Sequence, residues 1–174
     1  MTIEDKNQND IINSEIINSY NIDYVFSNKP INRLKTKPIL EDKSDQLNNL
    51  RTEIKNIENC ELKNNANNLV FNDGNNLSKI MIVGEGPGQK EDEIGKPFVG
   101  DAGALLNKML EAINVKRDKV YITNVVNYRP PNNRKPEPAE IIRYSNYLRK
   151  HISIIDPKIL ILMGSTAMES LFGS

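Results

Sequence analysis

The chain has 174 residues, the length of one domain with room for an extension. Its 23 basic and 23 acidic residues cancel, which excludes a histone-like polycation and a generally acidic protein. Hydrophobic residues make up 38% and aromatic residues 6%, so we expect part of the chain to contribute no core. We expect no membrane span, because no apolar run approaches about 20 residues. We also expect no secretory signal, because the first 30 residues lack a charged n-region, an apolar h-region and a small-residue cleavage site. The single cysteine, Cys60, excludes an internal disulfide and predicts a cytoplasmic location.

The N-terminal part of the chain is rich in asparagine, a residue that favours turns and caps over helix interiors. Helical periodicity in residues 11–20 and 46–57 is correspondingly weak. Residues 25–45 contain two prolines and no periodicity, which is typical of a linker. We therefore expect residues 1–50 to form a poorly ordered extension and linker, and residues 51–174 to form the folded domain.

From residue 79 onward, short apolar runs alternate with segments of helical periodicity. Strands are predicted at residues 79–83, 120–124 and 159–163. Helices are predicted at residues 102–113, 138–151 and 164–172. This alternation predicts an α/β fold in which helices cover both faces of a short parallel sheet. Ligands of such sheets bind beyond the carboxyl ends of the strands, so the turns after these strands form the candidate site.

The first of these turns is rich in glycine and carries an acidic side chain. Gly84, Gly86 and Gly88 let the backbone approach a ligand closely, and Glu85 lies at the tip of the strand. The spacing matches neither a Walker loop nor the dinucleotide-binding fingerprint. On its own the loop fits a tight strand-to-helix turn as well as a ligand site, and it leaves open a nucleotide- or sugar-binding module.

The second turn joins a polar strand end to a basic, proline-rich segment. Asn124 can offer one carbonyl and one amide to the edge of a nucleobase, or it can cap a turn. Arg129, Arg134 and Lys135 follow it, within residues 115–150, a stretch that holds nine basic and three acidic residues. This balance predicts contacts with DNA phosphates, the alternative being a solvated basic face.

Taken together and in this order, the motifs resemble the family 4 uracil-DNA glycosylases, which normally carry an iron–sulfur cluster. The resemblance rests on GEGPG (84–88), GKPFVG (95–100), VYITNVV (120–126) and RPPNNRKP (129–136), and it extends from about Cys60 to residue 173. It implies a three-layer αβα fold on a four-stranded parallel sheet, of which three strands are visible here. It also implies base excision repair by hydrolysis of the bond between uracil and deoxyribose in DNA.

The resemblance further implies roles for individual residues. Those matching acidic or polar positions near the catalytic water are Glu85, Glu91 and Asn133. Those matching positions around the flipped nucleotide are Gly86, which passes the sugar, Phe98, which stacks on uracil, and Asn124, which reads its edge. A base that is cut from DNA must leave the stack, so an aromatic platform, an edge reader and phosphate anchors agree with this chemistry.

At the metal site the chain departs from the family. The family holds its cluster with four cysteines, and here Cys60 stands at one of these positions while Ile57, Tyr128 and Tyr144 occupy the others. One thiolate with two phenols will not hold four irons, so we expect no metal site and no cofactor. The tyrosines and Ile57 are expected to fill the volume instead.

The C-terminal end departs from the family as well. The family continues to a fourth strand and an HPS motif, whose histidine stabilises negative charge on uracil, whereas this sequence stops at Ser174. Its one histidine, His151, is expected to cap a helix C-terminus and not to replace that group. Two hypotheses follow. One is a glycosylase acting on uracil-containing DNA; the other is a catalytically impaired pseudo-glycosylase fragment that binds DNA or completes its fold with a separately encoded C-terminal half.

Overall fold

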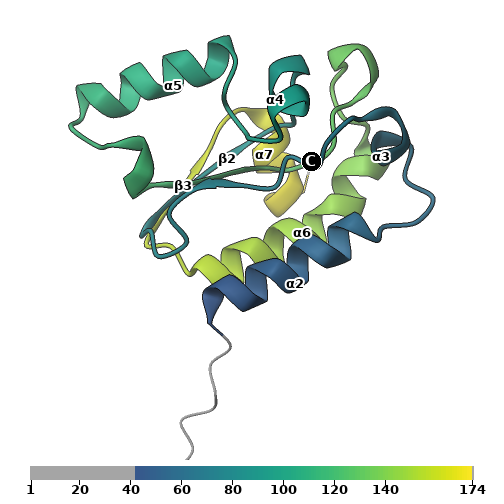
Figure 1. Cartoon of the computed structure of the whole chain (residues 1–174), viewed down its shortest axis with the longest axis horizontal. Helices are drawn as coiled ribbons and strands as arrows, with labels where there is room; N and C mark the ends of the chain where they lie inside the picture. Colours follow the sequence, from purple (N-terminus) through teal and green to yellow (C-terminus); the bar gives the residue numbers. More distant parts are fainter. Residues whose placement is uncertain (1–41, 174) are drawn as a thin grey trace, which may run out of the picture. The chain divides into compact units, whose positions relative to one another are not determined.

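Helices cover both faces of a central sheet in the computed structural model, which describes residues 42–173. Figure 1 shows helix α5 (Asp101–Ala112) on one side of the sheet, with helices α2 (Lys43–Lys55) and α6 (Pro138–Ile155) on the other. The predicted three-layer α/β arrangement is therefore confirmed. The shorter helical segments are α3 (Glu61–Asn65), α4 (Gln89–Ile94), α7 (Ser165–Phe172), η2 (Arg117–Lys119) and η3 (Pro131–Asn133).

The sheet has four strands in the order β1-β3-β2-β4. Their bounds are β1 (Asp73–Gly74), β2 (Ile80–Gly84), β3 (Tyr121–Asn124) and β4 (Ile159–Leu162). The three strands predicted from the sequence run parallel, whereas β1 pairs antiparallel with β3 and makes the sheet mixed. The sequence does not reveal β1, because two residues are too short to show a period.

Strand register brings the candidate residues to one edge of the sheet. Gly84 at the end of β2 pairs with Asn124 at the end of β3, and Val83 pairs with Leu162 at the end of β4. The carboxyl ends of the three parallel strands thus lie side by side, as ligand sites of α/β sheets require.

Each face of the sheet has its own apolar core. On the α5 side, Leu106 and Leu110 pack with Ile82, Val120 and Ile122. The larger core on the other side contains the buried residues of α2 and α6 together with strand residues: Leu47, Leu50, Ile54, Ile141, Tyr144, Leu148, Met81, Val83 and Tyr121. Residues alternate between these cores along β2, which is why this strand is an unbroken apolar run.

Helix α2 runs across residue 50, where the folded domain was expected to begin. Its residues Leu47 and Leu50 are buried in the main core with Ile54, so residues before 51 contribute to the fold. Asp42 begins the helix by accepting a hydrogen bond from the Ser44 amide. The helix predicted at residues 11–20, and most of the linker predicted at residues 25–45, lie outside the described residues.

His151 does not cap its helix, contrary to the expectation. Helix α6 continues for four more residues and ends at Asp156, which adopts the left-handed conformation. The His151 ring is buried beneath the sheet, with Nδ1 3.2 Å from the Tyr121 hydroxyl and the ring centroid 4.5 Å from that of Phe71. Burial, followed by the nearby charge of Arg51, lowers the pKa of His151 from 6.5 to about 3.

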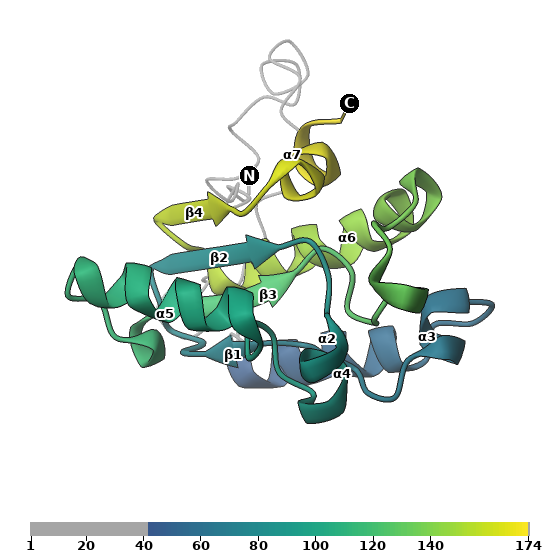
Figure 2. The ribbon, with the colours of Figure 1, turned by 90° about the horizontal axis from the view of Figure 1, so that it is seen from above.

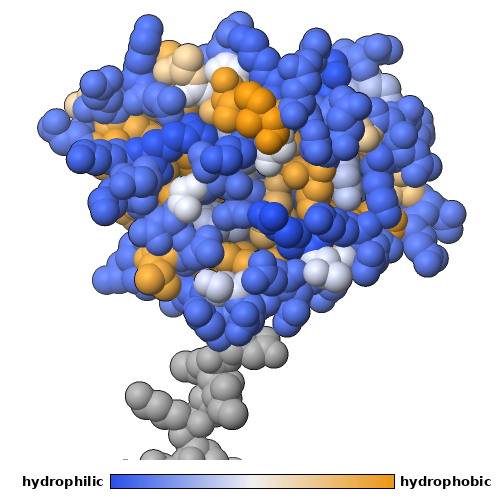
Figure 3. All heavy atoms as spheres, viewed as in Figure 1, coloured by the Kyte–Doolittle hydropathy of each residue, from blue (hydrophilic) through white to orange (hydrophobic). Residues whose placement is uncertain are grey.

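Strand β4 forms one edge of the sheet, and Figure 2 shows it with α7 at that end of the domain. Ile159 is 54% exposed and Ile161 is 38% exposed, so the α5-facing side of this strand is largely uncovered. The face drawn in Figure 3 is mostly hydrophilic, with apolar patches between polar side chains. Among the described helices, none combines the length and apolar character needed to cross a membrane.

Candidate functional site

Three of the candidate residues lie close together at the tips of β2 and β3. Gly84 and Asn124 are register partners, and Phe98 reaches the same place from the loop before α5. A Cβ atom added to Gly84 would lie 2.6 Å from Asn124 Oδ1 and 2.6 Å from the Cε2 and Cζ atoms of the Phe98 ring. Both predicted substrate-binding side chains therefore meet over the bare Cα of Gly84, which only glycine permits without a shift of its neighbours.

The carboxamide of Asn124 is buried without a hydrogen-bond partner. The residue is 3% exposed, and within residues 42–173 neither Oδ1 nor Nδ2 has a partner. Leaving a buried polar group without a hydrogen bond costs about 1–3 kcal/mol, so two such groups on one side chain indicate a binding role. One acceptor and one donor beside an aromatic ring match the edge and face of a planar polar ligand.

The backbone of Phe98 is strained, and Glu91 holds the loop that carries it. Phe98 has a φ of 53°, an uncommon conformation for an aromatic residue. Glu91 Oε1 accepts hydrogen bonds from the Val99 amide at 2.8 Å and the Gly100 amide at 2.7 Å, while Oε2 accepts one from Gly88. Both carboxylate oxygens of Glu91 are thus used by backbone amides, which gives this residue a positioning role.

Arg117 holds the same loop from its other side, and sequence reasoning missed it. Its Nη2 donates to the Pro97 carbonyl at 2.7 Å, one residue before Phe98. Its other donors bind Asp73 Oδ2 at 2.8 Å and Asn107 Oδ1 at 3.0 Å, which connects the loop to β1 and α5. In the sequence Arg117 is one of several basic residues in a basic stretch. Its partners lie 10 to 44 residues away along the chain, so no local pattern reveals its role.

Glu85 is held at the sheet edge by a second residue that the sequence did not reveal. Thr166 Oγ1 donates a hydrogen bond of 2.5 Å to Glu85 Oε2. Thr166 is fully buried in the first turn of α7, whereas Glu85 is exposed. Glu85 follows Gly84 directly, so Thr166 orients the carboxylate of the first residue after β2.

The two predicted turns pack on one another. The Val125 amide donates to the Gly84 carbonyl at 2.8 Å, and the Val126 amide donates to the Glu85 carbonyl at 3.1 Å. A Cβ on Gly86 would lie 2.7 Å from Val126 Cγ2, so glycine is needed for this approach. The glycine-rich loop (residues 84–88) and the basic loop (residues 129–136) therefore form one surface.

The basic loop places its polar residues in pairs. Asn133 is exposed in the left-handed conformation, and its Oδ1 accepts a hydrogen bond of 2.7 Å from Arg129 Nε. Arg134 forms a bidentate ion pair with Glu140, at 2.8 and 2.7 Å, which raises the pKa of Arg134 and lowers that of Glu140. Lys135 lies 3.6 Å from Glu169 and stays half exposed. Arg134 is consequently engaged within the domain, an arrangement that the sequence did not predict.

The residues at the four cluster positions do not fit an iron–sulfur cluster. Cys60 is the one cysteine of the chain, and its Sγ lies 3.3 Å from the Tyr144 hydroxyl. Ile57 and Tyr128 are buried in the same core. Clusters of this kind are held by thiolates, and within the described residues no group of three or more His, Cys, Asp or Glu side chains could bind a metal.

Comparison with known proteins identifies the family. Residues 71–174 match the model of the uracil DNA glycosylase superfamily. A type-4 uracil-DNA glycosylase of Sulfurisphaera tokodaii is 44% identical over 129 residues, which cover 74% of this chain and 59% of that protein. Type-4 enzymes of Thermotoga maritima and Archaeoglobus fulgidus are 47% and 41% identical; the matches cover 53% and 74% of this chain, and 48% and 64% of those proteins.

The matched region is long enough to define the class of protein, but it covers only part of each relative. The chain spans about half to two thirds of the length of these relatives. The chain belongs to the uracil DNA glycosylase superfamily, and its similarity to type-4 members confirms the resemblance carried by its sequence motifs.

Proposed function

We propose that the chain is a type-4 uracil-DNA glycosylase that removes uracil from DNA in base excision repair. The observation that carries this proposal is the buried, unpartnered carboxamide of Asn124, 3% exposed and lying beside the Phe98 ring over Gly84. A uracil ring would stack on Phe98 and supply both missing hydrogen bonds: its N3–H donates to Oδ1, and its O4 accepts from Nδ2.

In the proposed reaction, water displaces uracil from the sugar. The water oxygen forms a bond to C1′ as the C1′–N1 bond breaks, and the electron pair of that bond leaves with uracil N1. Glu85, held by Thr166, takes the water proton as the new bond forms, and solvent protonates the departing uracil. The products are free uracil and an abasic site. Asn133 is the alternative residue for orienting the water.

We assign the remaining residues according to their contacts. Arg129, which is partly exposed, and Lys135, which is exposed, bind phosphates of the DNA backbone in this proposal, whereas Arg134 acts through its ion pair with Glu140. Gly86 keeps the loop close to the sugar, and Glu91 positions Phe98. We propose that this domain works without a metal cofactor; its cytoplasmic location remains a prediction.

A second candidate function is DNA binding without turnover, by a domain that another polypeptide completes. The observation that favours it is the edge strand β4, where Ile159 and Ile161 are exposed. Unpaired edges invite pairing with a further strand. A separately encoded C-terminal half would supply that strand and the histidine of the HPS motif.

A uracil-release assay separates the two candidates. The full chain is incubated with single- and double-stranded DNA containing one deoxyuridine, and abasic sites are counted after alkaline cleavage. Release by the wild type, reduced about 100-fold or more in Asn124→Ala, supports the glycosylase. Salt-sensitive DNA binding with no release, turned into release by adding a C-terminal half, supports the second candidate.

A further inference from the structure

We propose that Ile57, Tyr128 and Tyr144 turn the family's metal centre into a metal-free junction, in which buried side chains and arginine contacts join the segments that a cluster would join. The proposal concerns the stability of the domain and does not depend on whether it releases uracil.

The side chains at all four cluster positions are buried, and a surface cavity of about 240 Å³ borders Cys60 and Tyr144. The exposed fractions are 7% for Ile57, 3% for Cys60, 5% for Tyr128 and 0% for Tyr144, and all four residues belong to one core. They come from three separate segments: the chain before α3, the start of the basic loop, and α6. A tyrosine side chain extends much further from the backbone than a cysteine, so the Tyr144 side chain reaches from α6 to Cys60.

The Tyr144 phenol is held as a hydrogen-bonding group and not as a metal ligand. Burial, together with the contact with Cys60, raises the pKa of Tyr144 far above its usual value, and burial likewise raises that of Tyr128. The Tyr144 hydroxyl pairs with Cys60 Sγ at 3.3 Å.

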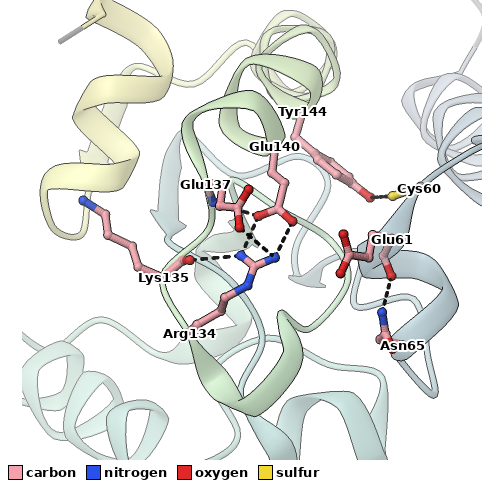
Figure 4. Close-up of polar contacts among 8 residues, drawn as sticks. All are labelled: Cys60, Glu61, Asn65, Arg134, Lys135, Glu137, Glu140 and Tyr144. Atoms are coloured by element: carbon pink, nitrogen blue, oxygen red, sulfur yellow. Dashed lines mark hydrogen bonds and ion pairs between the residues drawn. The ribbon is translucent and has the colours of Figure 1, made fainter.

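Charged side chains of α6 strengthen the same junction. Arg143, adjacent to Tyr144, donates from Nη1 to the Asn59 carbonyl at 2.7 Å and from Nη2 to the Glu58 carbonyl, which ties the segment before Cys60 to the helix. The bidentate pair of Arg134 with Glu140 ties the basic loop to the same helix, and Figure 4 shows it on the same side of α6 as the Cys60–Tyr144 contact. Each segment that carries a cluster position therefore has a contact with α6 that needs no metal.

The first experiment measures whether the wild-type chain depends on iron. The full chain is purified from iron-supplied cells, iron and sulfide per chain are determined, and thermal unfolding is followed with and without chelator and ferricyanide. We expect no stoichiometric iron and an unchanged unfolding midpoint. Iron near four atoms per chain, or a midpoint that falls with chelator, would overturn the proposal.

The second experiment separates packing from the hydroxyl contact. Tyr144→Phe keeps the ring and is expected to lower the unfolding midpoint by only a few degrees. Tyr144→Leu removes much of the ring and is expected to lower it by about 5–10 °C. Tyr147→Phe, on the same helix, is the matched control and should leave the midpoint unchanged. Equal midpoints for Tyr144→Leu and the wild type would contradict a packed junction.

The third experiment restores the cysteines. The triple variant Ile57→Cys, Tyr128→Cys, Tyr144→Cys is reconstituted anaerobically with iron and sulfide. We expect it to acquire cluster absorbance and about four irons per chain, and to lose both when Cys60→Ser is added. A folded triple variant that binds no iron would show that these positions do not form the cluster site. All three readouts are independent of uracil release, so a failure of the proposed function leaves this inference standing, and the reverse also holds.

Discussion

Gly84 and Asn124 are paired across β2 and β3, and the missing side chain of one makes room for the carboxamide of the other. A Cβ on Gly84 would lie 2.6 Å from Asn124 Oδ1 and equally close to the Phe98 ring. Both contacted groups belong to side chains, which would have to shift to make room for a methyl group. The absence of a side chain at Gly84 therefore decides where the Asn124 carboxamide and the Phe98 ring meet.

Gly84→Ala is expected to reduce uracil release about 10- to 100-fold while lowering the free energy of unfolding by about 1–3 kcal/mol. The added methyl group pushes Asn124 and Phe98 out of the positions where they meet. The check is uracil release together with urea unfolding of the same preparation. Normal release from this variant would show that the ligand does not occupy the space over Gly84.

Thr166→Val removes the hydroxyl that orients Glu85 and keeps the shape of the side chain. We expect kcat to fall about tenfold with little change in KM, because the loss of one hydrogen bond to the carboxylate is worth about 1.5 kcal/mol. Thr166→Ser retains the donor and should behave like the wild type. If the valine and serine variants have the same kcat, Thr166 does not act through Glu85.

Arg117→Lys keeps one positive charge but cannot reach Pro97, Asp73 and Asn107 together. We expect the loop carrying Phe98 to loosen, so that the amides of Val99 and Gly100 exchange with solvent at least about tenfold faster. Arg143→Lys is the control, because Arg143 also binds backbone carbonyls but contacts a different segment. Unchanged exchange at both amides in Arg117→Lys would exclude Arg117 from positioning the loop.

Stability should fall as the pH drops below 6.5, because His151 is buried as a neutral ring. Its pKa is about 3 in the folded chain and about 6.5 in the unfolded chain, so its contribution is complete above pH 6.5 and is lost on acidification. The slope grows from about 0.7 kcal/mol per pH unit at pH 6.5 to about 1.3 at pH 5, a range above the titration of carboxylates such as Glu140. Urea unfolding at both pH values measures it.

His151→Leu should remove most of this slope, since the chain has no other histidine. A variant that loses as much stability as the wild type between pH 6.5 and 5 would assign the effect to another group.

The sequence predicted those parts of the fold and site that local patterns encode. The three parallel strands and the placement of Asn124 and Glu85 at their tips follow from short apolar runs that end in polar residues. The functional importance of Phe98 came from the family resemblance. Its proximity to Asn124 depends on tertiary packing, which brings both side chains together over Gly84.

Residues that act through distant partners could not be predicted. Thr166 lies 81 residues from Glu85, and nothing in a one-dimensional pattern joins them. The ion pair of Arg134 with Glu140 and the burial of His151 could not be predicted for a related reason. From the sequence alone, a charged or titratable side chain is expected to be exposed, because its packing partners are not known.

The central claim, that the space between Asn124 and Phe98 receives uracil, can be tested without catalysis. The NMR signal of the Asn124 side-chain amide is first assigned as the one that disappears in Asn124→Ala. This signal is then followed in the full wild-type chain while uracil is added. We predict a saturable shift of this signal that is absent in Gly84→Ala. A signal that stays in place at saturating uracil would contradict the account.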